Sequence, residues 1–283
     1  MACRHPQRWL ASCVAVFLTP AMALALDADT VVIDPPAVPV GGLVVIHVRD
    51  PDPSGTFDGQ RLKFFHTEKE SAALVGIDLD HPPGRFPIQV STRGKGGVRE
   101  TIEVMAREFP VERLTVPPGY TDLDARTLRR ARREERLLKD LWLRSDSRRY
   151  WEGRFIAPAV GEAGSPFGLR RVFNGEPRSA HAGIDIRAGM GAAVRAANRG
   201  RVVLARGLFF TGNTVVLDHG LGLFTVYVHL SEMSARTGEI VEKGGVIGKV
   251  GATGRATGPH LHFATRIGDA RVDPEALLDR ALE

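Results

Sequence analysis

Short apolar runs interrupted by turn-forming residues recur along most of the chain, and they restrict it to a fold built mainly of β-strands. Residues 43–48 and 86–90 each precede a stretch rich in Pro, Gly or Asp. Further runs at 200–204, 213–217 and 224–228 are separated by glycine-rich turns. Such runs, rich in Val and Ile and bounded by turn residues, are typical of strands. The spacing shows no period that would indicate a solenoid or a propeller.

Three regions follow one another after the first residues. Residues 26–118 show strands and turns at the spacing of a small sandwich, and we predict an immunoglobulin-like β-module there. Residues 119–150 are predicted to form a connecting helix, because 121–124 offers a helix cap and apolar or long side chains then follow at helical steps: Leu128, Ala131, Glu135, Leu138 and Trp142. Residues 151–283 return to strands and are predicted to form a second β-rich domain.

The predicted helix carries a run of arginines: Arg129, Arg130, Arg132, Arg133 and Arg136. Glu134, Glu135 and Asp140 offset part of this charge. The mixture favours a solvated helix face over an anion-binding stripe.

The first 25 residues have the composition of a secretory signal rather than of a folded domain. Arg4 and Arg8 precede a short apolar run at 10–18, and small residues follow it. We predict cleavage after Ala25, with Ala23 as the second choice. The protein is therefore expected to be exported, to the periplasm or the cell wall.

Removal of this segment would remove both cysteines, Cys3 and Cys13. Cys13 closes a stretch that imitates a lipid-attachment box, but its apolar run follows the cysteine rather than preceding it, which argues against lipidation. The mature chain would then hold no disulfide and no thiolate, so any metal must be bound by imidazole and carboxylate groups.

The charge and hydropathy of the chain limit the classes of partner that it is expected to bind. Loss of Arg4 and Arg8 lowers the formal charge from +5 to +3, a mild basicity that suits an anionic wall or membrane surface. No other stretch approaches the roughly 20 apolar residues that a membrane-spanning helix needs, so we expect no transmembrane segment. We also expect no nucleic-acid partner.

Histidines gather in the C-terminal half of the chain. Five of the nine lie between His181 and His262. Two short patterns, His181-x-x-x-Asp185 and His260-x-His262, have metal-ligand spacing, and His229 lies between them. On an extended strand, side chains two apart face the same way, so His260 and His262 would project together. The even spacing of His181 and Asp185 permits the same.

These residue types suit zinc. A catalytic zinc usually takes three protein ligands and leaves its fourth position to water, and two imidazoles with one carboxylate meet that count. A single carboxylate also leaves the site net positive, so that it can polarise a carbonyl. We therefore predict a Zn²⁺ cofactor.

Several stretches in the same order resemble the lysostaphin-type (LytM-domain) zinc metallopeptidases, which cleave peptide cross-links or bridges in peptidoglycan. The resemblance covers about residues 157–274, and it is carried by Phe167-Gly168-Leu169-Arg170, His181-Ala182-Gly183-Ile184-Asp185-Ile186, Gly212-Asn213-Thr214-Val215-Val216, Tyr227-Val228-His229-Leu230-Ser231 and Gly254-Arg255-Ala256-Thr257-Gly258-Pro259-His260-Leu261-His262-Phe263. It implies a β-rich LytM-type peptidase fold for residues 151–283. The upstream region is more weakly similar to segments that accompany some exported members.

Carried over by position, the resemblance implies that His181, Asp185 and His262 bind zinc. It implies that His229 and His260 form a catalytic pair that does not hold the metal. In this mechanism a water loses a proton and attacks the scissile amide, while metal and imidazolium stabilise the oxyanion. Which of the two histidines takes the proton is left open.

The other histidines and the nearby glycines are expected to have structural rather than catalytic roles. His219 precedes a glycine turn at a position where the family usually has a non-catalytic histidine, and we leave it outside the site. His47, His66 and His81 are scattered and are expected to be packing or surface residues. Three glycines (Gly251, Gly254 and Gly258) lack the spacing of a phosphate loop and are expected to shape turns beside the metal.

The sequence differs from the family's usual motifs at two places. Residues 187–191 replace an Ala-Pro pair, and Ala264 stands where an acidic residue is common. Neither touches a predicted ligand, so they bear on loop shape and substrate preference rather than on the metal.

The leading prediction is a zinc metalloendopeptidase that hydrolyses peptidoglycan stem-peptide cross-links in cell-wall remodelling. A non-enzymatic activator of another wall hydrolase is the alternative, although such members usually lack ligands. A wall-binding module with a structural zinc is weaker still, because structural sites usually have four protein ligands. The expected bond joins D-alanine to diaminopimelate (a D,D-endopeptidase), with polyglycine bridges second. Any regulatory partner is left open.

Overall fold

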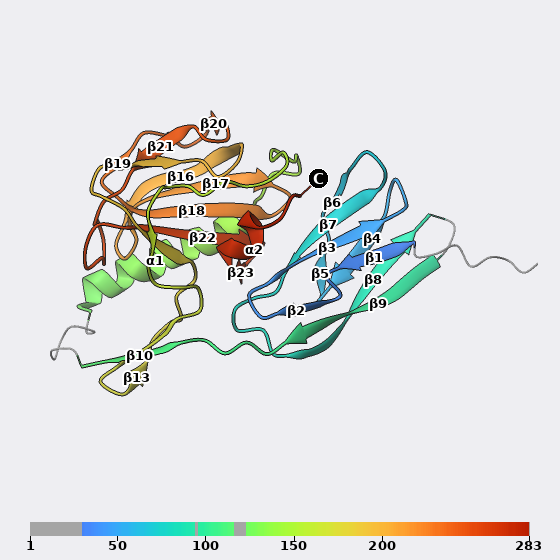
Figure 1. The fold of residues 1–283 in the computed structure, drawn as a ribbon, viewed down its shortest axis with the longest axis horizontal. Coiled ribbons are helices and arrows are strands. Elements are labelled where there is room, and N and C mark those ends of the chain that lie inside the picture. The colour runs from blue at the N-terminus through green and yellow to red at the C-terminus, as the bar shows by residue number, and fades with distance from the viewer. Residues whose placement is uncertain (1–29, 94–95, 116–122, 283) are drawn as a thin grey trace, which may run out of the picture.

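The computed structural model describes residues 30–93, 96–115 and 123–282, and strands dominate it (Figure 1). The mainly β fold predicted from the sequence is confirmed. The predicted signal segment lies outside the described residues, so its cleavage stays a prediction. None of the helices in the described part of the chain is long and apolar enough to cross a membrane.

Two sheets form a sandwich at the N-terminal side (Figure 1). One sheet has the order β1 (Val31–Asp34), β3 (Leu43–Val48), β7 (Ser71–Gly76) and β6 (Phe64–His66). The other has the order β2 (Ala37–Pro39), β9 (Gly96–Met105), β8 (Gly84–Thr92), β4 (Ser54–Phe57) and β5 (Gln60–Arg61). Apolar side chains from both sheets, among them Ile46, Val75, Ile88 and Ile102, share one core. A two-sheet sandwich matches the prediction, while its immunoglobulin-like class stays a prediction.

Strand β3 is buried on both of its faces. Val44 and Ile46 point into the sandwich, whereas Leu43 and Val45, on the opposite face, join a core that includes Trp151 of the C-terminal part. Because successive side chains of a strand alternate between faces, a strand covered on both sides reads as an unbroken apolar run. The run at 43–48 is therefore unbroken because β3 contacts the C-terminal part on one face and the core of the sandwich on the other.

The C-terminal part is built on a large antiparallel sheet (Figure 1). Its order is β11 (Glu162–Ala163), β14 (Ile184–Arg187), β22 (Leu261–Ile267), β18 (Leu223–Leu230), β17 (Gly212–Gly220), β16 (Gly200–Leu208) and β20 (Ile240–Val241), and β23 (Ala270–Val272) pairs with β22. A small sheet of β15 (Ala193–Arg195), β21 (Val246–Lys249) and β19 (Glu232–Met233) lies beside it. Helix α2 (Pro274–Leu278) follows β23.

Helix α1 (Ala125–Trp142) lies where the connecting helix was predicted. The Asp124 side chain caps it by accepting from the backbone N–H groups of Arg126 and Thr127, as the sequence indicated. Its buried end packs Trp142 against Phe224 of β18, with ring centroids 5.1 Å apart. Most of its arginines are exposed, in agreement with a solvated face.

Strand β10 (Val111–Leu114) lies in the range predicted for the N-terminal module but pairs elsewhere. It runs parallel to β12 (Arg170–Phe173), which also pairs with β13 (Glu176–Pro177). The aromatic ring of Phe109 fills the space over Gly168, because a Cβ on that glycine would lie 2.0 Å from the ring. The chain between the module and α1 therefore braces the segment that leads to His181. The predicted domain boundaries stay predictions.

An ion-pair cluster joins the N-terminal module to the C-terminal part. Asp78, just after β7, accepts from Arg271 of β23 at 2.6 and 3.0 Å, and Asp80 accepts from the same guanidinium at 2.8 Å. Burial would raise the pKa of Asp78, but the hydrogen bonds from Arg271 and the neighbouring backbone together lower it from 3.8 to about 2. A carboxyl whose pKa is lower in the folded state than in the unfolded state stabilises the fold at pH values above its unfolded-state pKa.

We expect Asp78→Asn to lower the free energy of unfolding at pH 7 by at most about 2 kcal/mol, because the ion pair is lost and its charges are partly screened. The wild-type advantage should shrink as the pH falls from about 4 towards 2, where Asp78 itself becomes protonated. Urea unfolding at pH 7 and at pH 3 measures this. Asp80→Asn is the control and should cost less, because Asp80 is more exposed. An equal cost at both pH values would contradict the assignment.

Candidate active site

Strand register places two of the predicted ligands directly opposite each other. Asp185 of β14 pairs with His262 of β22, and His262 pairs on its other side with Val228 of β18. β22 is therefore an inner strand, flanked by β14 on one side and by β18 on the other. His229 follows Val228 and His260 comes just before β22, so the central strands bring these residues to one region of the sheet.

His181 reaches the site from the loop before β14. Its backbone is held by two hydrogen bonds, from its N–H to the Leu169 carbonyl at 3.0 Å and from the Gly168 N–H to its own carbonyl at 2.8 Å. Its ring Nδ1 lies 2.9 Å from the Pro166 carbonyl. Because a carbonyl can only accept, this bond puts the proton on Nδ1 and leaves the lone pair on Nε2.

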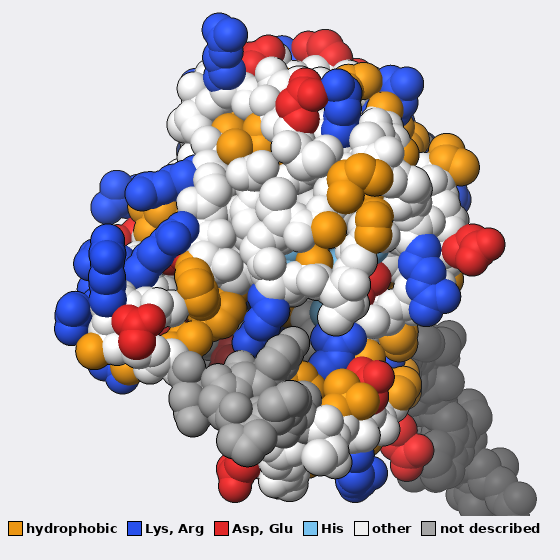
Figure 2. All heavy atoms as spheres, turned by 90° about the vertical axis from the view of Figure 1, so that its left-hand side faces the viewer, with side chains coloured by type: hydrophobic (Ala, Val, Ile, Leu, Met, Phe, Trp, Pro, Cys, Tyr) orange, Lys and Arg blue, Asp and Glu red, His pale blue; other side chains and the backbone are white. Residues whose placement is uncertain are grey.

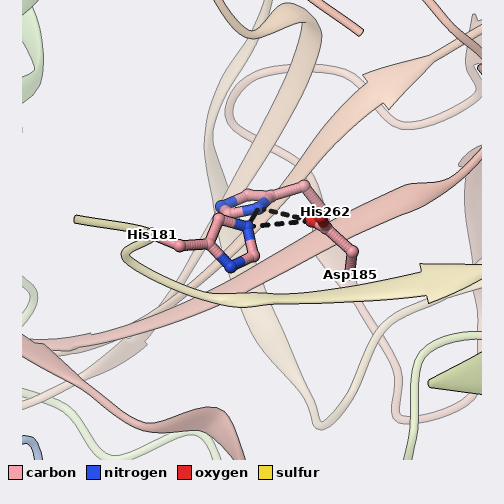
Figure 3. A group of neighbouring side chains, drawn as sticks. All are labelled: His181, Asp185 and His262. Carbon is pink, nitrogen blue, oxygen red and sulfur yellow. Dashed lines mark hydrogen bonds and ion pairs between the residues drawn. The ribbon is translucent and has the colours of Figure 1, made fainter. Parts of the chain in front are cut away.

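The three predicted ligands converge (Figure 3). His181 Nε2 lies 2.9 Å from Asp185 Oδ1 and 2.8 Å from His262 Nδ1, and His262 Nδ1 lies 3.0 Å from the same carboxylate oxygen. Their side chains are 9–16% exposed. Residues 81 positions apart in sequence thus offer donor atoms to one point.

The electrostatics keep Asp185 and His262 in the protonation states that a cation needs. Burial would raise the pKa of Asp185, but the hydrogen bonds from His181 and His262 together hold it well below its usual range. Burial lowers the pKa of His262 to about 4, against the hydrogen bond to Asp185, which raises it. At neutral pH the site therefore presents an ionised carboxylate and a neutral imidazole at His262.

The donor set fits zinc. A tetrahedral site with bonds of ~2.0–2.1 Å requires donor atoms ~3.3 Å apart, only a few tenths of an ångström more than the separations here. Two imidazoles and one carboxylate also match the usual three-ligand catalytic set. Among the described residues the group of possible ligands comprises these three, and no fourth joins them.

A second pair of histidines lies beside the three. The rings of His229 and His260 have centroids 4.8 Å apart, and His260 Nε2 lies 3.8 Å from Asp185 Oδ1. Each ring has its Nδ1 on a backbone carbonyl, His229 on Thr253 at 2.8 Å and His260 on Gly258 at 2.9 Å. The Nε2 atoms, which make no hydrogen bond to the described residues, are therefore the ones available to a substrate or water.

His229 has two further features. Its backbone has a φ of 63°, a left-handed conformation that is uncommon for a non-glycine residue. Burial, together with the nearby His260, lowers its pKa, although its hydrogen bond to Thr253 acts in the other direction. A neutral imidazole held in a fixed tautomer is suited to accept a proton.

The other histidines that the structure describes make contacts away from this cluster. His219 is fully buried, with Nδ1 on the Arg199 carbonyl at 2.7 Å and Nε2 on the Thr225 hydroxyl at 2.7 Å. In the N-terminal module, His47 pairs with Glu70 and His81 packs against Phe86. Both ring nitrogens of His219 are already used, which leaves it nothing to offer a metal.

Thr253, which holds His229, was not identified from the sequence. Its hydroxyl donates to the Leu230 carbonyl at 2.8 Å and accepts from the Asn213 N–H at 2.9 Å. Its own carbonyl is the acceptor for His229 Nδ1. The backbone of His229 is fixed as well, by a 3.0 Å bond to the Thr211 carbonyl. A threonine in a glycine-rich loop has no pattern that would distinguish such a role.

We expect Thr253→Val to lower kcat about 10-fold or more, because the loop that carries the carbonyl loses both anchors and His229 is no longer oriented. Zinc content should not change, since no predicted ligand is touched. Thr253→Ser should restore most of the activity. Thr237→Val is the control, because the Thr237 hydroxyl accepts from the Ala205 N–H, away from the histidines. If serine and valine behaved alike, the hydroxyl would not be the cause.

The site shows why certain glycines occur where they do. A Cβ on Gly251 would lie 2.2 Å from the Ser231 N atom and one on Gly254 would lie 2.3 Å from the Gly212 N atom. These close backbone approaches bring the 251–258 loop against β17 and β18. The prediction that these glycines shape turns beside the metal accords with this packing for Gly251 and Gly254. Gly258 has open space around it.

A cavity of about 800 Å³ lies away from the histidines. It is lined by the module's β4–β5 loop, the C-terminal half of α1 and residues 266–271. None of the five site residues lines it. This cavity is therefore separate from the histidine cluster.

The part of the chain that carries this cluster is similar to known proteins. A family model described as peptidase family M23 matches residues 179–274. A crystal structure from Pseudomonas aeruginosa, assigned to the M23 peptidases, superimposes with a TM-score of 0.70 at 30% identity, and the match covers 84% of this chain and 94% of that one.

Curated relatives match over a shorter stretch. The DD-carboxypeptidase/endopeptidase Mpg of Neisseria meningitidis is 43% identical over 110 residues, which are 39% of this chain and 25% of the relative. The peptidoglycan DD-endopeptidase ShyA of Vibrio cholerae is 41% identical over 111 residues, or 39% and 26%. The chain thus spans about a quarter of the length of these relatives.

Proposed function

Because the chain belongs to peptidase family M23, we propose that it is a zinc metalloendopeptidase that hydrolyses peptide cross-links of peptidoglycan outside the cytoplasm. The observation that carries the proposal is the convergence of His181, Asp185 and His262 within 3.0 Å of one another, beside a second pair of histidines with fixed tautomers. The names of the relatives support the substrate.

Each residue of the cluster has a distinct role in this proposal. His181 Nε2, a carboxylate oxygen of Asp185 and His262 Nδ1 would hold the zinc. Zinc bound there supplies Lewis acidity to a carbonyl oxygen and lowers the pKa of water in its open position. The Pro166 carbonyl keeps the His181 imidazole oriented for the metal.

His229 and His260 would move protons and bind the developing charge. Both offer Nε2 towards the same region, so one accepts a proton from the attacking water and the other, once protonated, stabilises the oxyanion. The lowered pKa of His229 favours it as the neutral acceptor at physiological pH. The proton then passes to the leaving amine as the carbon–nitrogen bond breaks.

The two alternatives are less well supported. A non-enzymatic activator would not need two further histidines with their tautomers fixed beside an intact ligand set. A structural zinc would call for a fourth protein ligand, and none joins the three in the part of the chain that the structure describes.

We propose a D-alanyl–diaminopimelate cross-link as the bond cleaved, because the relatives are named as DD-peptidases. Polyglycine bridges remain the second candidate. The predicted signal segment and the periplasm or cell wall as the site of action belong to the same proposal.

Digestion of purified, cross-linked peptidoglycan tests the function. The chain without residues 1–25 is incubated with sacculi, with a chelator, and with chelator followed by added zinc, and the muropeptides are identified by mass. Loss of cross-linked dimers that stops with chelator and returns with zinc is expected. Retention of all dimers by a zinc-loaded protein would refute the endopeptidase and favour the activator.

A further inference from the structure

Beside the histidine pair, the loop after Thr253 carries an arginine whose charge is not balanced. Arg255 is exposed, and no carboxylate in the described ranges pairs with it. It lies two residues after Thr253, whose carbonyl accepts from His229, so the Cα atoms of Thr253 and Arg255 are at most ~7 Å apart. A long, cationic side chain therefore begins close to the proposed catalytic groups.

Arg255 is also held in place. Its N–H donates to the Phe210 carbonyl at 2.8 Å, and its guanidinium lies over the Phe210 ring, 4.7 Å from the centroid. Phe210 immediately precedes Thr211, which accepts from the His229 N–H. A cation stacked on an aromatic ring keeps its N–H groups, in the plane of the guanidinium, available to a planar acceptor such as a carboxylate.

A neighbouring arginine shows the contrast. Arg130 of α1 lies over Phe209, 5.8 Å from its centroid, and the rings of Phe209 and Phe210 are 4.9 Å apart. Arg130 donates to the Glu134 carboxylate at 2.7 Å, so its positive charge is paired within the protein. Arg255, at the end of the same stack, lacks such a partner among the residues described. Figure 2 shows histidine side chains recessed near the middle of one face, with Lys and Arg side chains at their edge.

We propose that Arg255 binds a free carboxylate of the substrate next to the scissile bond and so determines which cross-links are cleaved. This inference rests on the proposed function. In a cross-link to diaminopimelate, the carbon that bears the scissile nitrogen also bears a free carboxylate, whereas a polyglycine bridge has none at that position. Arg255 would discriminate between the two by pairing with that group, as a guanidinium does with a carboxylate.

The test uses two cross-linked muropeptide dimers that differ only in this group: one with the free carboxylate, one with it converted to the amide. Wild type is expected to prefer the free acid. Arg255→Gln should lower kcat/KM for the free acid about 10- to 100-fold, mostly through KM, and leave the amidated dimer little changed. Arg255→Lys should retain part of the preference.

Arg206→Gln is the matched control, because Arg206 is an exposed arginine of β16 and the substitution removes the same charge. It should leave both dimers unaffected. Equal loss on the two dimers in Arg255→Gln, or a wild type without preference, would overturn the inference while the endopeptidase stands. A wild type that cleaves neither dimer would remove both proposals.

Discussion

His181→Ala and His262→Ala variants are expected to purify without stoichiometric zinc and to lose at least about 10³-fold in cross-link cleavage. Each substitution removes one of three donor atoms that lie within 3.0 Å of one another, and it leaves the Asp185 carboxylate partly buried with one partner fewer. A loss of that size corresponds to about 4 kcal/mol of transition-state stabilisation. Metal analysis and muropeptide digestion of the same samples measure both effects.

The proposed proton-transfer pair should behave differently. His229→Ala is expected to keep its zinc and still lose most of its activity, because its ring contacts His260 and belongs to no ligand set. His66→Ala is the control, since His66 is exposed in the N-terminal module. If His229→Ala lost zinc as readily as His181→Ala, the division between ligands and proton-transfer residues would have to be abandoned.

Part of the site could be predicted because Asp185 and His262 lie on regular, paired strands, whereas His181 comes from the loop before β14. His260 forms a β-bridge with Gly251 just before β22, and the two-residue alternation of extended backbone places its side chain on the same face as that of His262. The spacing of the motif carries this information in the sequence. The helix cap at Asp124 was likewise local and therefore predictable. In each case neighbouring residues determine the geometry.

The parts that could not be predicted depend on contacts between distant segments. Thr253 holds His229 from 24 positions away, and Phe109 covers Gly168 from 59 positions away, and neither contact leaves a periodic trace. The pairing of β10 with β12 is also long-range. A sequence records that residues 111–114 are suited to a strand, but not which sheet they join.

The packing of the module bears on what it does for the site. Its outer face shares a core with the C-terminal part through Leu43 and Val45, and the Asp78–Arg271 pair adds a polar contact at the same boundary. The segment after the module then pairs with β12, which leads to His181. Buried apolar contact and an ion pair therefore both hold the module against the C-terminal part.

Gly183→Ala is expected to disable the enzyme without altering any chemical group of the site. A Cβ on Gly183 would lie 2.3 Å from the Phe263 carbonyl oxygen and 2.9 Å from His262 Nε2. The backbone oxygen cannot move aside as the end of a flexible side chain could, so β14 must separate from β22 where Asp185 faces His262. A displacement of about 1 Å between reacting groups can cost roughly 100-fold in rate, and overpacking typically costs about 1–3 kcal/mol of stability.

Cleavage assays, zinc titration and thermal unfolding would show weaker zinc binding in a protein that still folds. Gly189→Ala is the matched control, since nothing lies within 4 Å of the added Cβ. Wild-type zinc affinity and activity in Gly183→Ala would mean that close contact between β14 and β22 is not what positions the ligands.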